Sequence, residues 1–302
     1  MKIGELAKKV IKAIIGDTRW RLRYVERRVG EIMRLTDIRK IPKAAGVNRM
    51  IQLSTLALLK DITEVISGEG IQYSLCGGTL LGAIRHKGFI PWDDDVDMAV
   101  LRKDYDHVYE LLRGRYNEQN GFRVVRSTCI RVIMDGAPTQ VDIFPFEIHT
   151  VPDDNEIGRK AFSQLRDRYI KTRLKIDWNR LETDGMVIVN LDDKGVARLI
   201  ADFAREDKGA KKIMATGVEA GNEGYPPLKY EWVFPLKSVE FEGVSFMGPA
   251  EPEVILYNYF GDYMQYPPTL HSHGDIRRRL SVDALLLMRR FIRQHAWINL
   301  DD

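Results

Sequence analysis

Four of the five residues from Asp93 to Asp97 are aspartates, and only Val96 interrupts the run. Like charges packed this closely repel one another unless a cation neutralises them. In a strand, Asp95 and Asp97 would share one face, while Val96 and Met98 would point toward a core on the other. Two carboxylates held in this way suit a divalent ion that prefers oxygen ligands, such as Mg²⁺ or Mn²⁺. A solvated acidic turn is the alternative interpretation, but it does not account for the alternation with apolar residues.

A glycine turn and a basic stretch precede these aspartates. Gly77, Gly78 and Thr79 open an apolar run, and two adjacent glycines allow backbone N–H groups to approach phosphate oxygens closely. If the run is a helix, Thr79 lies near its N-terminus, where the helix dipole favours anions. A plain turn is the equally common alternative. The donor groups that follow, and that we expect to contact phosphate, are Arg85, His86 and Lys87.

A third acidic candidate, Asp142, lies between Val141 and Ile143 in an apolar segment typical of a strand. A lone aspartate inside such a strand is unfavourable unless it binds something. An edge strand with Asp142 facing water is the alternative. We therefore consider Asp142 together with Asp95 and Asp97.

The elements that must position these residues alternate between helix and strand. Apolar spacing predicts a helix over residues 48–66 with Asn48 as its N-cap, and alternation predicts a strand over 71–75. The glycine turn then follows the end of a strand, which is a common place for ligands in sheets that carry helices. Beyond Gly221 we expect mostly loop. Other predicted elements are strands at 130–134 and 140–144 and helices at 159–180, 196–204 and 282–295.

The composition excludes several classes of protein. The chain has 302 residues, of which 44% are hydrophobic and 29% charged, so it can bury a core and is not globally disordered. No stretch approaches the roughly 18 uninterrupted apolar residues of a membrane span. Cys76 and Cys129 are the only cysteines, too few for a disulfide framework or a cysteine-rich zinc site. Since no secretory pattern opens the chain, we expect a cytoplasmic protein.

The net charge of +3 conceals a basic N-terminal segment. The first 30 residues contain nine lysines and arginines against three acidic residues, a local charge of about +6. Apolar residues from Ile3 to Ile14 recur near helical spacing. We expect residues 1–30 to form a basic amphipathic helix that contacts an anionic membrane from the cytoplasm. The alternative is a helix docked on its own domain with a solvated basic face.

The window from Gly77 to Asp97 resembles the signature of the LicD family, which includes bacterial phosphocholine transferases and is related to the fukutin-related proteins. The segment Val-Asp-Ile-Phe-Pro at 141–145 resembles the later acidic strand of that family. The resemblance spans roughly residues 50–275. Further similar segments are Phe241-Glu-Gly243, Pro249, residues 259–264, Pro267-Pro268 and the pair His271 and His273.

The resemblance implies an α+β fold, with a nucleotidyltransferase-like core sheet flanked by helices, a helical N-terminal arm and a loop-rich C-terminal part. In such folds a Gly-Gly turn lies beside an Asp-x-Asp strand, and a third carboxylate lies on a neighbouring strand. We expect an arm over 1–45, a catalytic core over 46–150, and over 151–302 a part that binds donor and acceptor and packs on the core.

The resemblance also implies a reaction. A phosphoalcohol, most readily phosphocholine, would pass from a CDP-activated donor to a sugar hydroxyl, with CMP as the leaving group. The acceptor would be a glycan or lipid-linked glycan of the cell surface, such as lipopolysaccharide, teichoic acid or capsule. CDP-ribitol and CDP-glycerol are the rival donors, and the lack of a cysteine cluster favours the simpler bacterial type over members that bind zinc.

Under this resemblance, Asp95, Asp97 and Asp142 would hold one or two Mg²⁺ or Mn²⁺ ions that bridge the phosphates and stabilise developing charge. Asp142 could instead be the base that takes the proton of the acceptor hydroxyl. Asp93 and Asp94 would support the metal site or bind the acceptor. The residues expected at the donor phosphates and the leaving CMP are Gly77, Gly78, Thr79, Arg85, His86 and Lys87.

A choline donor would require aromatic faces that attract its quaternary ammonium group. A nucleotidyltransferase acting on RNA is a less favoured alternative, because the chain lacks an aromatic and basic platform for RNA, and we expect no nucleic-acid partner. A non-catalytic binding protein is disfavoured, because idle clustered carboxylates would only destabilise the fold. The aromatic candidates are Trp178, Tyr230, Trp232, Tyr257, Tyr259, Tyr263 and Tyr266.

Overall fold

The structure is a computed structural model that describes residues 3–174, 209–217, 225–267 and 280–298. The chain groups into two compact units, one made of Met1–Pro42 and Asp262–Leu270 and the other of Lys43–Gly261 and His271–Asp302. The three-part division expected from the sequence, with boundaries at residues 45 and 150, stays a prediction.

The first unit contains α1, a single helix from Ile3 to Leu35 that the periodicity of the N-terminal residues predicts. In the described part of the chain, no helix is both long enough and apolar enough to cross a membrane. A short turn, η1 (Ile38–Lys40), follows α1 and is capped by Asp37, whose carboxylate accepts the Arg39 N–H at 3.0 Å. Large apolar side chains are exposed along the second half of α1, among them Trp20, Leu22, Tyr24, Val25, Val29, Ile32 and Leu35.

The second unit is built on a mixed sheet of seven strands. Here β2 (Asp97–Leu101) and β5 (Gln140–Val151) run parallel, and they form the one parallel pair among the described strands. A parallel pair needs a long connection, and the chain between these two strands forms a helix and a hairpin. The other strands are β1 (Tyr73–Leu75) beside β2, β4 (Ile130–Met134) beside β5, β3 (Phe122–Arg126) beside β4, β6 (Lys211–Thr216) beside the second half of β5, and β7 (Leu228–Lys229) beside β6.

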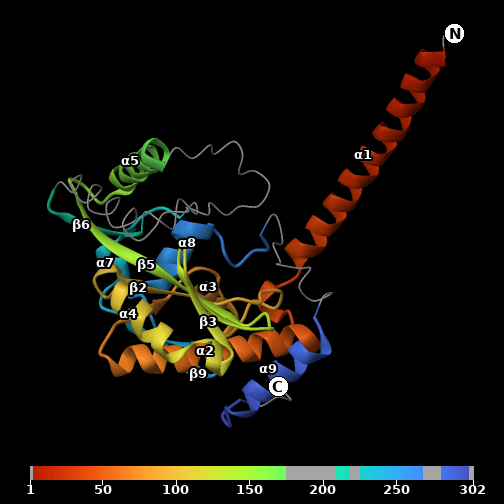
Figure 1. Ribbon diagram of the computed structural model, residues 1–302. Coiled ribbons are helices and arrows are strands. Elements are labelled where there is room, and N and C mark those ends of the chain that lie inside the picture. Colours follow the sequence, from red (N-terminus) through yellow and green to blue (C-terminus); the bar gives the residue numbers. More distant parts are fainter. Residues whose placement is uncertain (1–2, 175–208, 218–224, 268–279, 299–302) are drawn as a thin grey trace. The chain divides into compact units, whose positions relative to one another are not determined.

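Helices pack against this sheet, so the fold is α+β. Apolar side chains of α2 (Gly46–Gly68) and α4 (Arg102–Arg115) form the main core together with the strands. Figure 1 shows α2 and α9 (Val282–Arg293) side by side, and the Asp61 carboxylate lies 3.0 Å from the His295 ring just after α9. The remaining elements are α3 (Gly77–His86), η2 (Glu118–Asn120), α5 (Glu156–Leu174), α7 (Tyr230–Val233), α8 (Pro252–Phe260) and a separate hairpin of β8 (Lys237–Phe241) and β9 (Val244–Gly248).

Most of the elements expected from the sequence are present, with corrections at their ends. The helix expected over 48–66 is α2, but its N-cap is Ala45 and not Asn48, whose side chain is used elsewhere. The strand expected at 140–144 continues to Val151, because β6 pairs with its second half. The described residues beyond Gly221 contain more regular structure than their prolines and aromatics indicated. The helix expected over 196–204 lies outside the described residues.

Polar side chains on α2 hold the loop between α3 and β2. Asn48 Nδ2 donates to the carbonyl of Pro91 at 3.1 Å. Gln52 Nε2 donates to the carbonyl of Asp93 at 2.7 Å and to that of Ile90 at 3.3 Å. Because a buried amide is costly without hydrogen bonds, these contacts determine where the loop backbone lies. The loop that carries the aspartates is therefore attached to the core.

A second support, the Glu242 clamp, joins Glu242, Arg49, Lys43 and Phe89. Glu242 occupies the turn of the β8–β9 hairpin with a φ of 51°, and its side chain is 3% exposed. Its carboxylate accepts hydrogen bonds from Arg49 at 2.8 Å, from Lys43 at 2.9 Å and from the Phe89 N–H at 3.0 Å. Its own N–H donates to the carbonyl of Lys87 at 2.9 Å. One carboxylate thus connects the hairpin, α2 and the loop after α3.

Burial raises the pKa of Glu242, but the hydrogen bonds and charges of Arg49 and Lys43 lower it, and the result lies below the ordinary value of 4.5. A carboxyl group whose pKa is lowered by folding stabilises the protein fully above its unfolded-state pKa. That contribution is lost as the pH falls through the folded-state value. The Glu242 clamp should therefore weaken only in acid, below pH about 4.5.

We expect Glu242→Gln to lower the free energy of unfolding at pH 7 by about 3 kcal/mol, because the buried Arg49 cation loses its partner. Urea denaturation measures this difference. Glu240→Gln, at an exposed position on β8, is the matched control and should change the free energy by less than about 0.5 kcal/mol. If both variants lose the same amount, the Glu242 clamp does not stabilise the fold.

Candidate active site

The first turn of α3 lies against the start of β2. Gly77 opens the helix with a φ of +54°, and a Cβ atom added to it would lie 2.6 Å from Asp97 Oδ2. The Asp97 N–H donates to Thr79 Oγ1 at 2.8 Å, and the Cys76 N–H donates to the Asp97 carbonyl at 3.2 Å. Glycine is therefore required at position 77 both by its backbone conformation and by the carboxylate that approaches it.

The second glycine of the turn faces another carboxylate. A Cβ atom added to Gly78 would lie 3.1 Å from Asp93 Oδ2. The first turn of a helix has N–H groups without intrahelical partners, and its dipole favours anions. Asp93 and Asp97 thus both approach the positive end of α3.

Asp97 and Asp142 are direct neighbours across the parallel pair of β2 and β5. Paired residues point to the same face of a sheet, and neighbouring strands lie about 4.8 Å apart. The Asp142 N–H donates to the carbonyl of Val96 at 2.9 Å, and Asp142 is 7% exposed. Two carboxylates are thus held side by side where water screens them poorly, which is unfavourable without a cation.

Arg131 on β4 supplies a cation from the other side of Asp142, since the two residues are paired across β4 and β5. Arg131 Nε donates to Asp142 Oδ1 at 2.6 Å, and a second guanidinium nitrogen donates to Oδ2. The hydrogen bond to Asp142 raises the pKa of Arg131 despite burial, and the charge of Asp95 raises it further. Asp97, Asp142 and Arg131 therefore form a row across three neighbouring strands.

Cys129 also contacts Asp142, with its Sγ 3.6 Å from Oδ2. Burial raises the pKa of the Cys129 thiol, and the negative charges of Asp142 and Asp97 act in the same direction. The thiol therefore stays protonated at neutral pH and can donate to the carboxylate.

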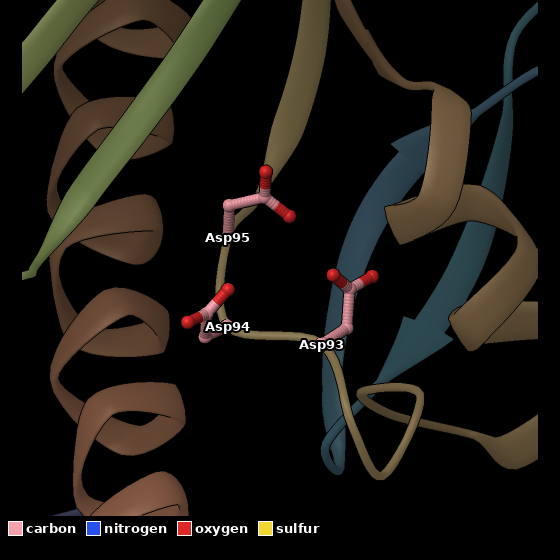
Figure 2. Close-up of side chains that lie close together, drawn as sticks. All are labelled: Asp93, Asp94 and Asp95. Carbon is pink, nitrogen blue, oxygen red and sulfur yellow. The ribbon is translucent and has the colours of Figure 1, made fainter. Parts of the chain in front are cut away.

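The loop before β2 brings three carboxylates together. One carboxylate oxygen from each of Asp93, Asp94 and Asp95 lies within 4.8 Å of the other two, and Figure 2 shows the three side chains around the bend of the loop. Among the described residues, this is the one group of three at such spacing. The strand begins at Asp97, so Asp95 belongs to the loop and groups with Asp93 and Asp94.

Two acidic sets therefore adjoin: Asp93–Asp95 in the loop, and Asp97 with Asp142 on the sheet. The glycine turn touches one member of each set, Asp93 and Asp97. On the other side, Arg131 forms an ion pair with Asp142, and the charge of Asp95 contributes to its raised pKa. The three ligands expected from the sequence thus lie in one neighbourhood, but they do not form a group of three at the spacing of the loop cluster. Their role as metal ligands stays a prediction.

The basic residues after the glycine turn occupy different environments. Arg85 is buried, and its Nε donates to His86 Nδ1 at 3.3 Å. Burial lowers the pKa of Arg85 to about 10, while the charge of Asp93 opposes this effect. Lys87 is exposed and ends α3 in the left-handed conformation. Of these residues, Arg85 is therefore the cation that faces the acidic loop.

Two of the aromatic candidates, Trp232 and Tyr230, already contact cations of the protein itself. Arg159 lies 4.6 Å from the ring centroid of Trp232, and Lys212 lies 5.4 Å from that of Tyr230. Tyr259 differs, because it packs against Tyr225 with ring centroids 4.5 Å apart. Burial raises the pKa of Tyr259, which belongs to α8, a helix that packs against α3. Tyr257 is exposed, Tyr263 and Tyr266 belong to the first unit, and Trp178, His271 and His273 lie outside the described residues.

Arg131 is a residue of this site that the sequence did not lead us to expect. A charged residue inside the apolar segment Ile130–Met134 is the same kind of signal that indicated Asp142. The buried polar side chains of α2, Asn48, Arg49 and Gln52, were likewise detectable as polar residues within an apolar helix.

The residues of this site lie in a segment that is similar to a known domain. The sequence profile of the LicD/FKTN/FKRP nucleotidyltransferase domain matches residues 70–184, a range that contains the glycine turn, the aspartates and Arg131. The chain is 27% identical over 248 residues to lipopolysaccharide cholinephosphotransferase LicD of Haemophilus influenzae, an alignment that covers 72% of this chain and 91% of the relative.

Other similar proteins align with a smaller part of this chain or have a lower sequence identity. The chain is 34% identical over 92 residues to ribitol 5-phosphate transferase FKRP of Homo sapiens, which covers 28% of this chain and 19% of that relative. Among solved structures, ANT(2″)-Ia in complex with adenylyl-2″-tobramycin is 11% identical and covers 80% of this chain and 98% of its own, but the TM-score of 0.34 is too low to support an argument. Residues 70–184 are thus similar to the LicD/FKTN/FKRP nucleotidyltransferase domain, and the alignment with LicD extends the similarity over most of the chain.

Proposed function

We propose that this protein transfers a phosphoalcohol from a CDP-activated donor to a sugar hydroxyl of a cell-surface glycan and releases CMP. Phosphocholine is the first candidate for the transferred group, because the alignment with the cholinephosphotransferase LicD covers 91% of that relative. The observation that carries the proposal is the position of Asp97 and Asp142 beside the glycine turn of α3. A CDP-ribitol or CDP-glycerol donor is the second candidate, supported by the local similarity to FKRP.

The acidic residues fit a hard divalent cation such as Mg²⁺ or Mn²⁺. All the candidate donors are carboxylate oxygens, and Asp97 and Asp142 are neighbours that need a positive charge between them. Asp97, Asp142 and Asp95 would hold the ion, with Asp93 and Asp94 adjoining. A bound ion would supply neutralisation of the charge that develops on the phosphates during transfer.

The other residues of the site can bind and orient the donor. N–H groups in the first turn of α3, at Gly78 and Thr79, would hold phosphate oxygens. Arg85 faces the acidic loop from the last turn of α3 and would offset charge on the leaving CMP. A role for Asp142 in taking the acceptor's proton would require Arg131 to leave it, because both Asp142 oxygens accept hydrogen bonds from Arg131.

The direct test measures CMP release from CDP-choline, CDP-ribitol and CDP-glycerol, with Mg²⁺ or Mn²⁺ and a crude glycan acceptor. We expect Asp97→Asn to lower the rate about 10²–10³-fold, as for the loss of one group that stabilises transition-state charge. Asp135→Asn is the control, since Asp135 pairs with Arg123 at the surface. Full activity of Asp97→Asn, or of the wild type in a chelator, would contradict the mechanism. Release from CDP-ribitol alone would transfer the assignment to the second candidate.

The glycine turn gives an independent prediction. Gly77→Ala should lower the rate of CMP release at least about tenfold, because the new Cβ displaces the Asp97 carboxylate and its φ is strained. Gly114→Ala in α4 is the control, because no atom lies within 4 Å of the added Cβ. We expect it to keep full activity and to gain up to about 1 kcal/mol of stability. Equal activity of the two variants would mean that the turn does not position Asp97.

We propose further that α1 lies on the anionic inner face of the membrane from the cytoplasm. Its exposed apolar side chains alternate with the exposed arginines Arg21, Arg23, Arg27 and Arg28, a composition suited to the boundary between headgroups and acyl chains. The proposal concerns only peripheral contact, which agrees with the apolar length of the described helices.

Sedimentation with lipid vesicles tests this contact. The double change Arg23→Gln and Arg27→Gln should weaken binding to phosphatidylglycerol vesicles roughly 30-fold, at about 1 kcal/mol for each lost cation. Lys160→Gln, which removes an exposed cation from α5, should have no effect. Equal binding to neutral vesicles, or an equal loss in the control, would show that α1 does not bind anionic lipid.

A further inference from the structure

When no cation is bound, the positive charge of Arg131 reduces the repulsion between Asp97 and Asp142. The side chains of Arg131 and Asp142 are 21% and 9% exposed, so water screens their interaction only weakly. The guanidinium fork meets both oxygens of the carboxylate, the strongest geometry for such a pair. Without Arg131, the buried Asp142 carboxylate would lose this partner beside the neighbouring Asp97.

The arginine and a divalent cation would compete for the same oxygens. A cation bound by Asp97 and Asp142 needs an Asp142 oxygen at about 2.1 Å for Mg²⁺, and it places two positive charges next to the guanidinium. The ion pair of Arg131 with both Asp142 oxygens uses about half of the lone-pair sites of that carboxylate, and a cation bound there would repel the guanidinium. We therefore expect a bound cation to weaken the pair between Arg131 and Asp142 and to favour displacement of one arm of the guanidinium.

A displaced Arg131 remains charged, because a guanidinium does not lose its proton in proteins. Its backbone is held in the sheet between β3 and β5, so the side chain can only turn within the site. The charge of Asp95 acts on Arg131, and Asp95 groups with Asp93, the carboxylate beside Gly78 of the glycine turn. The anion that would enter there in the proposed reaction is the diphosphate of the donor.

We propose that Arg131 is a positioning residue that neutralises Asp142 until a divalent cation binds, and that it then pairs with a phosphate of the donor. The second half of this inference rests on the proposed function, whereas the competition for Asp142 does not. Arg131 would thereby link cation binding to donor binding. The cation would release Arg131 from Asp142, and the released guanidinium would pair with a donor phosphate. A bound donor would in turn keep Arg131 away from Asp142 and so favour the cation.

The competition is tested by Mn²⁺ alone, without nucleotide, on the purified full chain by isothermal titration calorimetry. We expect Arg131→Gln to bind Mn²⁺ about fivefold more tightly or better, the lower end of typical coupling between two sites. Arg123→Gln is the matched control, because Arg123 forms an exposed pair with Asp135 on the neighbouring strand. Unchanged or weaker Mn²⁺ binding by Arg131→Gln would overturn the proposal.

Two further measurements distinguish competition for Asp142 from a folding defect of the Arg131→Gln variant. Mn²⁺ should raise the Tm of Arg131→Gln by more than it raises that of the wild type, because the cation replaces the lost guanidinium charge. Arg131→Lys keeps the charge without the fork, and its Mn²⁺ affinity should lie between the other two. A smaller Tm shift in Arg131→Gln, or Arg131→Lys binding Mn²⁺ more tightly than Arg131→Gln, would contradict competition.

The donor half predicts opposite effects on two quantities. At saturating Mn²⁺, kcat/KM for CDP-choline should fall about tenfold or more in Arg131→Gln, although the same variant binds Mn²⁺ more tightly. A merely structural role would weaken both. If the wild type releases CMP and the variant keeps its kcat/KM, pairing with the donor is wrong and the proposed function stands. If the wild type releases no CMP from any CDP-alcohol, the proposed function fails, and the Mn²⁺ titration still decides the competition for Asp142.

Discussion

The arrangement of this protein depends on holding Asp97 and Asp142 next to each other in spite of their like charges. The parallel pairing of β2 and β5 makes them neighbours, and the sheet prevents them from moving apart. Their repulsion is met on one side by Arg131 and on the other by the positive end of α3. This unfavourable arrangement is the one that the proposed function would use, with a cation and an anionic donor at the same site.

The remaining contacts keep this pair and its loop in place. Gln52 and Asn48 hold the loop backbone from α2, and the Glu242 clamp fastens the segment between α3 and that loop. These are buried polar contacts, which are unfavourable when incomplete and specific when satisfied. The aspartates therefore lie on a supported backbone, as the proposed phosphoryl-group transfer would require of residues that hold charge in a fixed geometry.

The local sequence pattern was sufficient to predict the helices and strands that surround the site. Helical spacing indicated α2, alternation indicated β1 and β5, and the aspartates alternate with buried Val96 and Met98 as expected. The grouping of the carboxylates was not predictable, because it depends on where β2 begins and on its register with β5. The Glu242 clamp joins residues almost 200 positions apart, and the role of Arg131 requires knowing which strand lies beside β5. Such information is absent from any short window of sequence.

The Glu242 clamp also shows how much of the chain is needed to support the loop that carries the aspartates. The range that matches the family profile begins after α2 and ends before the β8–β9 hairpin. Arg49 and Glu242, which secure the loop inside that range, therefore both lie outside it. A fragment cut at the borders of this profile match would lack Arg49 and Glu242, and the loop with the aspartates would lose the support of the Glu242 clamp.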